Sequence, residues 1–193
     1  MIIAITKEGF INRTPKSEFK VQQIGKTENI KKFYSKGINI IKEATLDETL
    51  LLFTNGGKCY KIKVSEIPST TISEIGISLN ELFGIRNETF CTLIPIKSFY
   101  TDEELNNSYI LIMTRYWKIV RQKLKDYIGA KNGITTITLN EGDQLVSAVL
   151  CTKEKYLFNC NIYSRGKIFN VEDIPINSLS SKPKGVLCGN GSY

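Results

Sequence analysis

Short alternating runs of apolar and polar residues, separated by glycine, recur along the chain. Four of them are rich in Ile, Val, Tyr, Phe and Thr and are bounded by Gly, Asn and Asp, which is typical of β-strands joined by turns. These runs cover residues 50–64, 108–122, 144–152 and 155–171. Helix signals are few. The best helical stretch, residues 73–85, contains Gly76 and Gly84, so any helix there must be short. The pattern predicts an all-β fold.

The strands form four hairpins that can be overlaid on one another. Their turn positions are 48, 60 and 49 residues apart, at Gly9, Gly57, Trp117 and Gly166. After each turn comes a strand and then an acidic residue followed by a large apolar one. These pairs are Glu18-Phe19, Glu66-Ile67, Asp126-Tyr127 and Asp173-Ile174. Self-similarity with a period of about 50 residues indicates stacked or radially arranged units.

A second element lies between the hairpins: a glycine followed by a β-branched residue and an alternating run. It occurs at Gly37, Gly76, Gly133 and Gly185. Each period then holds about four short strands, the content of one propeller blade, and the chain length gives about four periods. Neighbouring blades in a ring would cover the edges and the apolar face that one sheet exposes. We expect one domain over residues 1–193, a propeller-like disc of about four four-stranded blades, with a sandwich of hairpins as the alternative.

Composition excludes several classes of function. The chain has no histidine, which removes the commonest general base and every Ser-His or Cys-His nucleophile pair. Its five cysteines are scattered without a CxxC pair, so we expect small buried residues in a reducing cytosol rather than a zinc site or a disulfide framework. No apolar run reaches the roughly 18 residues of a membrane span, and no export signal is visible. We expect a cytoplasmic protein with no catalytic residues, no metal and no cofactor of its own.

The net charge of +7 is unevenly distributed. Residues 1–42 hold nine Lys and Arg against three Glu, and residues 109–135 hold six against one Asp. Such clustering favours a basic face for a polyanion, although a solvated lysine-rich surface is the alternative.

The ordered motifs resemble the C-terminal domain of the A subunit of bacterial DNA gyrase and topoisomerase IV. The motifs are TKEGFINRTPKSEF, LLLFTNGGKCYKIKVSEIP, TLIPIKSF and GITTITLNEGDQLVSAVL, and the likeness covers residues 2–188. The resemblance implies a β-pinwheel, a disc of four-stranded blades that exchange a strand between neighbours, with DNA bent around its basic rim. It also implies a fragment of a longer polypeptide that does no chemistry, because the strand-cleaving tyrosine, the Mg²⁺ site and the ATPase of the parent enzyme lie elsewhere.

The same resemblance implies the partners: double-stranded DNA, the ATPase subunit, and the catalytic N-terminal part of the polypeptide to which the domain belongs. The isolated domain is expected to be monomeric. Gyrase is distinguished by a box reading Gln-Arg-Arg-Gly-Gly-(Lys/Arg)-Gly after the first hairpin. Residues 21–32 read VQQIGKTENIKK instead, where Gln22, Gly25 and Lys26 form a degenerate remnant. This departure favours topoisomerase IV over gyrase, and bending over full wrapping.

Bending a duplex requires many phosphate contacts along a curved path, because the deformation costs several kcal/mol. The candidates lie near the end of each second hairpin strand and in the loop that follows. They are Arg13, Lys16, Lys20, Lys26, Lys31, Lys32 and Lys36 in the first module; Lys58, Lys61 and Lys63 in the second; Arg121, Lys123, Lys125 and Lys131 in the third; and Arg165, Lys167, Lys182 and Lys184 in the fourth. Nothing in the pattern suggests an element that reads base edges, so we expect little sequence preference.

Two other classes of function stay open at this point. One is a small propeller-like module for protein–protein interaction, in which the lysines only solubilise the surface. The other is an enzyme built on a ring-shaped platform, which the missing histidine and the absence of clustered acids or a phosphate-binding glycine loop disfavour.

Overall fold

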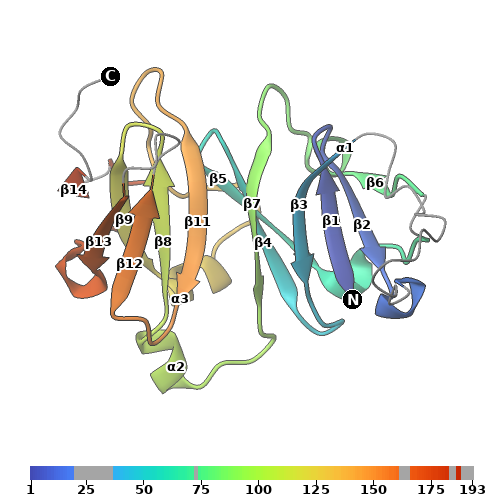
Figure 1. Ribbon diagram of the computed structural model, residues 1–193, viewed down its shortest axis with the longest axis horizontal. Helices are drawn as coiled ribbons and strands as arrows, with labels where there is room; N and C mark the ends of the chain where they lie inside the picture. The colour runs from blue at the N-terminus through green and yellow to red at the C-terminus, as the bar shows by residue number, and fades with distance from the viewer. Residues whose placement is uncertain (20–36, 72–73, 161–165, 183–185, 188–193) are drawn as a thin grey trace, which may run out of the picture. The chain divides into compact units, whose positions relative to one another are not determined.

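The computed structural model describes residues 1–19, 37–71, 74–160, 166–182 and 186–187. Its strands are organised around four successive hairpins (Figure 1). These are β1 (Ile2–Thr6) with β2 (Phe10–Thr14), β4 (Thr49–Thr54) with β5 (Lys58–Lys63), β8 (Tyr109–Thr114) with β9 (Lys118–Lys123), and β12 (Tyr156–Cys160) with β13 (Gly166–Asn170). The all-β prediction is confirmed.

Three of the hairpins are completed to four-stranded sheets by the same rule. The first strand of the hairpin pairs with an outer strand, which is β3 (Ile38–Glu43) on β1, β7 (Phe90–Ile96) on β4, and β11 (Leu145–Cys151) on β8. The second strand pairs with a two-residue strand that comes after the next hairpin, which is β6 (Ile77–Ser78) on β2, β10 (Ile134–Thr135) on β5, and β14 (Val186–Leu187) on β9. Each module therefore donates a strand to the one before it. Within the described residues β12 and β13 form a two-stranded sheet.

The glycine-led segments have two different roles. Gly76 and Gly133 precede the exchanged strands β6 and β10. Gly37 precedes β3, which is the outer strand on β1 and corresponds to β7 and β11, so overlaying Gly37 on the other glycines is wrong. All three glycines have positive φ, at 70°, 80° and 77° for Gly37, Gly76 and Gly133. The three segments therefore share the same local glycine turn, but tertiary packing decides which strand each of them pairs with. Gly185 lies outside the described residues.

The first three hairpin turns share one hydrogen-bonding scheme. The carbonyls of Thr6, Thr54 and Thr114 accept the N–H groups three residues on, at 3.0, 3.0 and 3.1 Å. The Oγ1 atom of each threonine then accepts the next N–H, at 3.1, 3.2 and 3.4 Å. Because these threonines are buried at the strand ends, each hydroxyl binds the backbone in place of water.

The third turn places Trp117 where the first two have glycine. Its φ of 64° matches the 84° of Gly9 and the 82° of Gly57, a conformation that costs a residue with a Cβ atom roughly 1–2 kcal/mol. The tryptophan side chain packs against a buried cluster and offsets this cost. Gly166, the expected fourth turn position, is instead the first residue of β13, opposite Cys160.

The acidic–apolar pairs lie in or directly after short helical turns that end the second strands. These turns are the 3₁₀ helices η1 (Lys16–Glu18), η2 (Val64–Glu66) and η3 (Val171–Asp173), and the α-helix α3 (Leu124–Ile128). The apolar residue returns to the interior, since Ile67, Tyr127 and Ile174 are buried. The repeated motif therefore encodes a strand ending that brings a large side chain back into the core.

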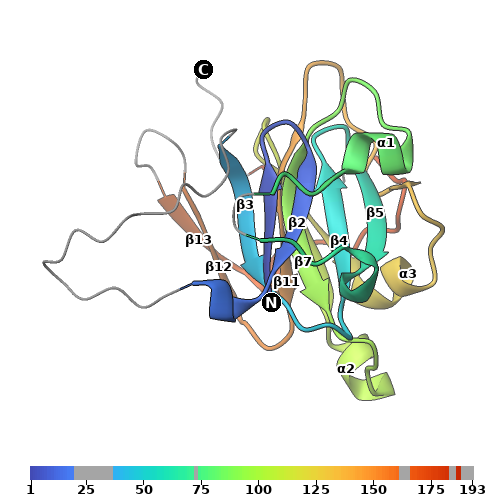
Figure 2. The same cartoon turned by 90° about the vertical axis from the view of Figure 1, so that its right-hand side faces the viewer.

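Two further helices are short and capped. Helix α1 (Leu79–Phe83) lies within the expected helical stretch, with a Ser78 N-cap and a left-handed Gly84 at its end. Helix α2 (Asp102–Asn106) was not expected; the hydroxyl of Thr101 caps it, and Glu104 bonds back to the N–H of Thr101 at 2.9 Å. Helices α2 and α3 contact each other (Figures 1 and 2).

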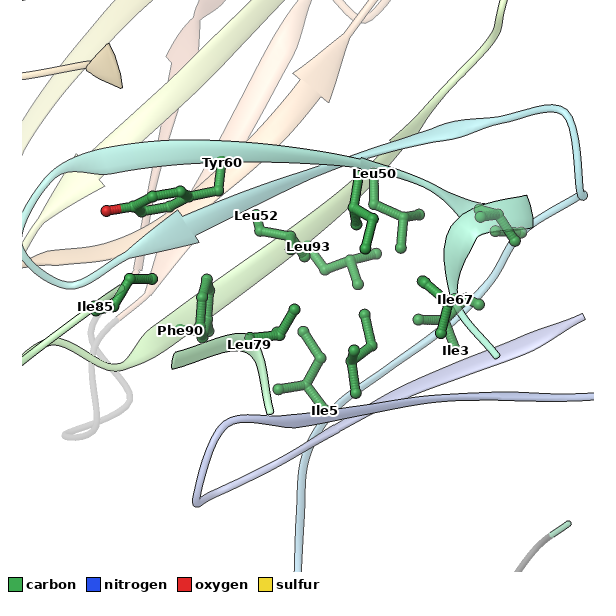
Figure 3. Close-up of a cluster of buried hydrophobic side chains, with 14 residues drawn as sticks. Ile3, Ile5, Leu50, Leu52, Tyr60, Ile67, Leu79, Ile85, Phe90 and Leu93 are labelled. Atoms are coloured by element: carbon green, nitrogen blue, oxygen red, sulfur yellow. The ribbon is translucent and has the colours of Figure 1, made fainter. Parts of the chain in front are cut away.

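The chain divides into two compact units. Unit 1 comprises Met1–Leu52 and Tyr60–Ser98, and unit 2 comprises Phe53–Cys59 and Phe99–Tyr193. The core of unit 1 joins side chains of several strands with residues of the helical turns and α1; among them are Ile3, Ile5, Leu50, Leu52, Tyr60, Ile67, Leu79, Ile85, Phe90 and Leu93 (Figure 3). A buried cluster in unit 2 comprises Leu111, Ile119, Cys151, Val171 and Ile174.

Candidate nucleic-acid interface

Basic residues recur directly after the hairpin turns. This place, called here the first position of the second strand, holds Phe10 in β2, Lys58 in β5 and Lys118 in β9. Lys58 and Lys118 both pair with the second residue of an exchanged strand, opposite Thr135 and Leu187 respectively.

Lys167 follows Gly166 as Lys58 follows Gly57 in the sequence, but Gly166 already belongs to β13, so Lys167 is the second residue of that strand. Lys118 was not among the sequence candidates. The pairing position that it shares with Lys58 is the signal that identifies it.

A second set lies three residues further along, at the fourth position of the second strand: Arg13, Lys61 and Arg121. All three are half-buried. The backbones of Arg13 and Arg121 bind segments of the next module. The Arg13 carbonyl accepts the N–H of Thr70 at 2.9 Å, and the Arg121 carbonyl accepts the N–H of Asn177 at 2.7 Å. This position is therefore part of the contact between modules.

The guanidinium of Arg121 is engaged within unit 2. It lies 4.8 Å from the ring centroid of Tyr109, a cation–π distance, and its Nη2 donates to the carbonyl of Glu172 at 3.4 Å. The Nε atoms of Arg13 and Arg121 are both buried and have no hydrogen-bond partner among the described residues. These two arginines consequently offer less of their guanidinium to a phosphate than an extended lysine does.

The remaining described candidates lie at or beyond the ends of the second strands. Lys63, Lys125, Lys131 and Lys182 are exposed, and Lys123 is half-buried. Acidic residues of the following helical turns accompany them, as Glu66 does after Lys63 and Asp126 after Lys125. The ends of the second strands therefore carry both signs of charge, a feature that counting lysines alone does not reveal.

Lys16 is exposed and forms an ion pair with Glu43 of β3. The hydrogen bond from Lys16 lowers the pKa of the Glu43 carboxyl. Because both side chains are more than half exposed, water and salt screen the pair, and it contributes little to stability. A phosphate would have to compete with Glu43 for this lysine.

The other candidates lie outside the described residues. They are Lys20, Lys26, Lys31, Lys32, Lys36, Arg165 and Lys184, together with Gln22 and Gly25 of the degenerate box.

Few groups with metal-binding or redox chemistry lie in the part of the chain that the structure describes. No cluster of three or more Cys, Asp or Glu residues in that part could hold a metal ion. Burial raises the pKa of the Cys91 thiol to about 12 and that of Cys151 to about 11, so both stay protonated at neutral pH. Cys160 is exposed, so the expectation that the cysteines are buried is wrong for this residue. No helix of the described residues has the length and apolar character of a membrane span.

Comparisons with known proteins agree with this architecture. The family model described as DNA gyrase C-terminal domain, beta-propeller, matches residues 1–23, 48–81 and 117–152. The A subunit of DNA gyrase from Dehalogenimonas lykanthroporepellens is 27% identical over 186 residues, which cover 94% of this chain and 22% of that protein. The chain thus spans about a fifth of the length of the curated relatives it matches.

Two solved structures share the fold. The C-terminal domain of DNA topoisomerase IV aligns with a TM-score of 0.71 and 23% identity over 95% of this chain and 55% of that chain. The DNA gyrase A C-terminal domain aligns with a TM-score of 0.72 and 24% identity over 95% of this chain and 59% of that chain. These likenesses confirm the β-pinwheel, or propeller-like, fold class and do not separate gyrase from topoisomerase IV.

Proposed function

We propose that this chain, whose sequence and fold are similar to those of the C-terminal domain of the A subunit of DNA gyrase and topoisomerase IV, binds double-stranded DNA and bends it. The contacts go to phosphates and carry little sequence preference. One observation carries the proposal: Lys58 and Lys118 open β5 and β9 and Lys167 is the second residue of β13, so lysines recur at the start of successive second strands, within a fold shared with these DNA topoisomerase domains. Repeated modules offer the duplex equivalent contacts at regular intervals.

The energetics favour many weak contacts over a few strong ones. Each phosphate neutralised by a lysine releases condensed counterions, and the gain is sequence-independent. Bending a site of 20–30 base pairs costs about 1–6 kcal/mol, which added contacts along the curve offset. Lys58, Lys118 and Lys167 all belong to unit 2, so one compact unit carries three of these contacts.

The wider role follows from the same assignment. The chain acts as an accessory domain that controls DNA topology, while strand cleavage, Mg²⁺ and ATP belong to other parts of the enzyme. Its partners besides DNA are the ATPase subunit, in the cytoplasm, and the catalytic N-terminal part of its own polypeptide; the isolated domain is monomeric. The degenerate box at Gln22, Gly25 and Lys26 favours topoisomerase IV, in which the domain bends DNA without wrapping a full loop.

Duplex binding at several salt concentrations tests the proposal. The expected slope of log affinity against log salt is about −0.9 for each phosphate neutralised. A triple variant, Lys58→Gln, Lys118→Gln and Lys167→Gln, should bind all sequences more weakly and reduce the slope by roughly 3 if each lysine neutralises one phosphate.

The matched control removes three other lysines, with Lys42→Gln, Lys153→Gln and Lys155→Gln. These three are exposed and lie on the outer strand β3 or in the loop before β12, so the net charge changes equally. Equal weakening by both triple variants would mean that the second strands have no special role. A salt-independent affinity of the unaltered chain would exclude a phosphate-binding surface altogether.

A further inference from the structure

The turn of the third hairpin carries a second basic residue beside Lys118. The N–H of Trp117 closes the turn on the carbonyl of Thr114 at 3.1 Å, and the N–H of Lys118 donates to the Thr114 hydroxyl at 3.4 Å. Arg115 is the residue directly after Thr114, and its side chain is exposed. Arg115 and Lys118 therefore flank one turn at the end of the hairpin.

The first hairpin has a basic residue at the same place. Lys7 directly follows β1 as Arg115 directly follows β8, and both side chains are exposed. Their backbones are anchored alike, since the N–H of Lys7 donates to the carbonyl of Gly37 at 3.2 Å and the N–H of Arg115 donates to that of Gln144 at 2.7 Å. Each acceptor directly precedes an outer strand, β3 or β11. Neither basic residue was among the sequence candidates, which lie in the second strands and beyond them.

The loop before β11 holds the third turn through a buried carboxylate. Asp143 is 7% exposed, and its Oδ1 atom accepts the N–H groups of Tyr116 and Gln144, both at 2.9 Å. The N–H of Asp143 donates to the carbonyl of Asn140 at 3.1 Å, which closes the loop on itself. The Oδ2 atom is buried and accepts no hydrogen bond within the described residues. The backbone of the turn is thus held by one oxygen of a side chain from another strand.

The same loop holds the side chain of Tyr116. A Cβ atom on Gly142 would lie 2.7 Å from the hydroxyl oxygen of Tyr116, so the phenol occupies the space beside this glycine. Gly142 has a φ of 75°, a conformation that favours glycine. Because both the backbone and the ring of Tyr116 are fixed, the direction of its neighbour Arg115 is fixed with them.

The loop also reaches the turn of the second hairpin. Leu145, the residue after Gln144, donates its N–H to the carbonyl of Asn55 at 3.0 Å. Asn55 directly follows β4 as Arg115 directly follows β8, and all of these residues belong to unit 2. Two adjacent residues of one loop therefore fix the turns of the second and third hairpins relative to each other.

We propose that Asp143 is a positioning residue for duplex binding, which holds the third turn in the conformation in which Arg115 contacts a phosphate beside Lys118. The inference rests on the DNA binding proposed above, and it adds a phosphate ligand and the residue that orients it. A guanidinium binds phosphate through paired N–H donors in a fixed plane, so its contact depends on direction more than that of a lysine ammonium. Anchoring the turn in advance also reduces the conformational entropy lost on binding.

Substitutions at residue 143 separate the hydrogen bonds from the charge. Asp143→Asn keeps a side-chain oxygen that can accept both N–H groups, whereas Asp143→Ala removes it, and both variants lose one negative charge. The lost charge alone would favour DNA binding in both variants. Positioning predicts instead that Asp143→Ala binds more weakly and reduces the slope of log affinity against log salt by about 0.9, the value for one phosphate contact, while Asp143→Asn keeps the slope. Glu141→Ala is the matched control, since it removes an exposed carboxylate from the same loop and should not weaken binding.

Arg115→Gln tests the phosphate ligand directly. The side chain is exposed, so the substitution should leave the fold intact, and it should reduce the salt slope by about 0.9. Adding Asp143→Ala to Arg115→Gln should reduce the slope no further, because the group that Asp143 orients is already absent. Trp117 fluorescence and circular dichroism verify that each variant is folded at the temperature of the titration.

Three results would each overturn the inference: an unaltered slope for Arg115→Gln, equal weakening by Asp143→Asn and Asp143→Ala, or additive losses in the double variant. Arg115→Gln decides the question even if Asp143→Ala does not fold, because it leaves the loop before β11 intact. These results leave the proposed DNA binding standing as long as the affinity of the unaltered chain depends on salt. A salt-independent affinity of the unaltered chain would overturn the proposed function, and this inference with it.

Discussion

The Tyr127 hydroxyl donates a hydrogen bond to the Gln122 side-chain carbonyl in the interior of unit 2, where both residues are buried. The Gln122 amide group in turn donates to the carbonyls of Thr136 and Ser178, at 2.8 and 3.2 Å. One glutamine thus connects the second strand of the third module to the segment that continues β10 and to a segment following the fourth hairpin. The exchanged segments are held by a buried polar network as well as by apolar packing.

Removing the donor of this network should be costly. Tyr127→Phe leaves the Gln122 carbonyl buried without its partner, and the free energy of unfolding should fall by about 1–3 kcal/mol. Chemical denaturation monitored by Trp117 fluorescence measures this. Tyr156→Phe on the exposed face of β12 is the control and should change stability by less than about 0.5 kcal/mol. Equal effects of the two variants would mean that the network contributes nothing.

Alkaline pH should destabilise the chain through the same tyrosine. Burial raises the pKa of Tyr127 well above 10, so the folded state keeps a proton that the unfolded state releases above about pH 10. The unfolded state then binds fewer protons, and stability falls as pH rises through that range. Tyr127→Phe should lose less stability than the unaltered chain between about pH 9.5 and 11, as measured by denaturation midpoints. Parallel curves for the two proteins would contradict the assignment.

Much of the fold could be predicted from sequence because its signals are local. The turn glycines, the acidic–apolar pairs and the alternating strands each depend on a few adjacent residues, and their recurrence revealed the modules. The partner of a glycine-led segment depends on tertiary pairing, which is why Gly37 resembles Gly76 in sequence yet precedes an outer strand. Helix α2 was missed because its capping residues, Thr101 and Glu104, lie in a short polar stretch with no apolar periodicity.

The sequence predicted most of the basic residues of the candidate site, but not the contacts that each of them makes. Counting basic residues found most members, but it treated Arg121 and Lys125 alike. The cation–π contact of Arg121 with Tyr109 distinguishes the two residues, and it joins side chains that are far apart in the sequence. Lys118 was overlooked because tryptophan replaces the glycine that precedes Lys58 and Lys167 in the sequence.

Glycine at the start of an exchanged strand is a strict requirement. Gly76→Ala should destabilise the chain by roughly 3 kcal/mol or more, because the added Cβ would meet the Ile11 carbonyl oxygen at 2.1 Å and Asn12 Oδ1 at 2.3 Å, at a φ of 80°. Gly84→Ala is the matched control: its φ is 62°, nothing lies within 4 Å of the added atom, and the cost should be about 1–2 kcal/mol. Thermal unfolding of both variants compares steric conflict with backbone strain. A Gly76→Ala variant as stable as Gly84→Ala would show that β6 can move away from β2 at little cost.

Arg121 and Lys118 lie three residues apart on β9 and should respond differently to substitution. Arg121→Gln removes the contact with Tyr109 and the hydrogen bond to the Glu172 carbonyl, and should lower the free energy of unfolding by about 1 kcal/mol. Lys118→Gln should leave stability nearly unchanged and reduce the salt slope of DNA binding by about 0.9, since it removes one phosphate contact. Denaturation and duplex titrations on both variants separate the two roles. Should Arg121→Gln reduce the salt slope as much as Lys118→Gln while leaving stability intact, the arginine would be a phosphate ligand and its packing on Tyr109 incidental.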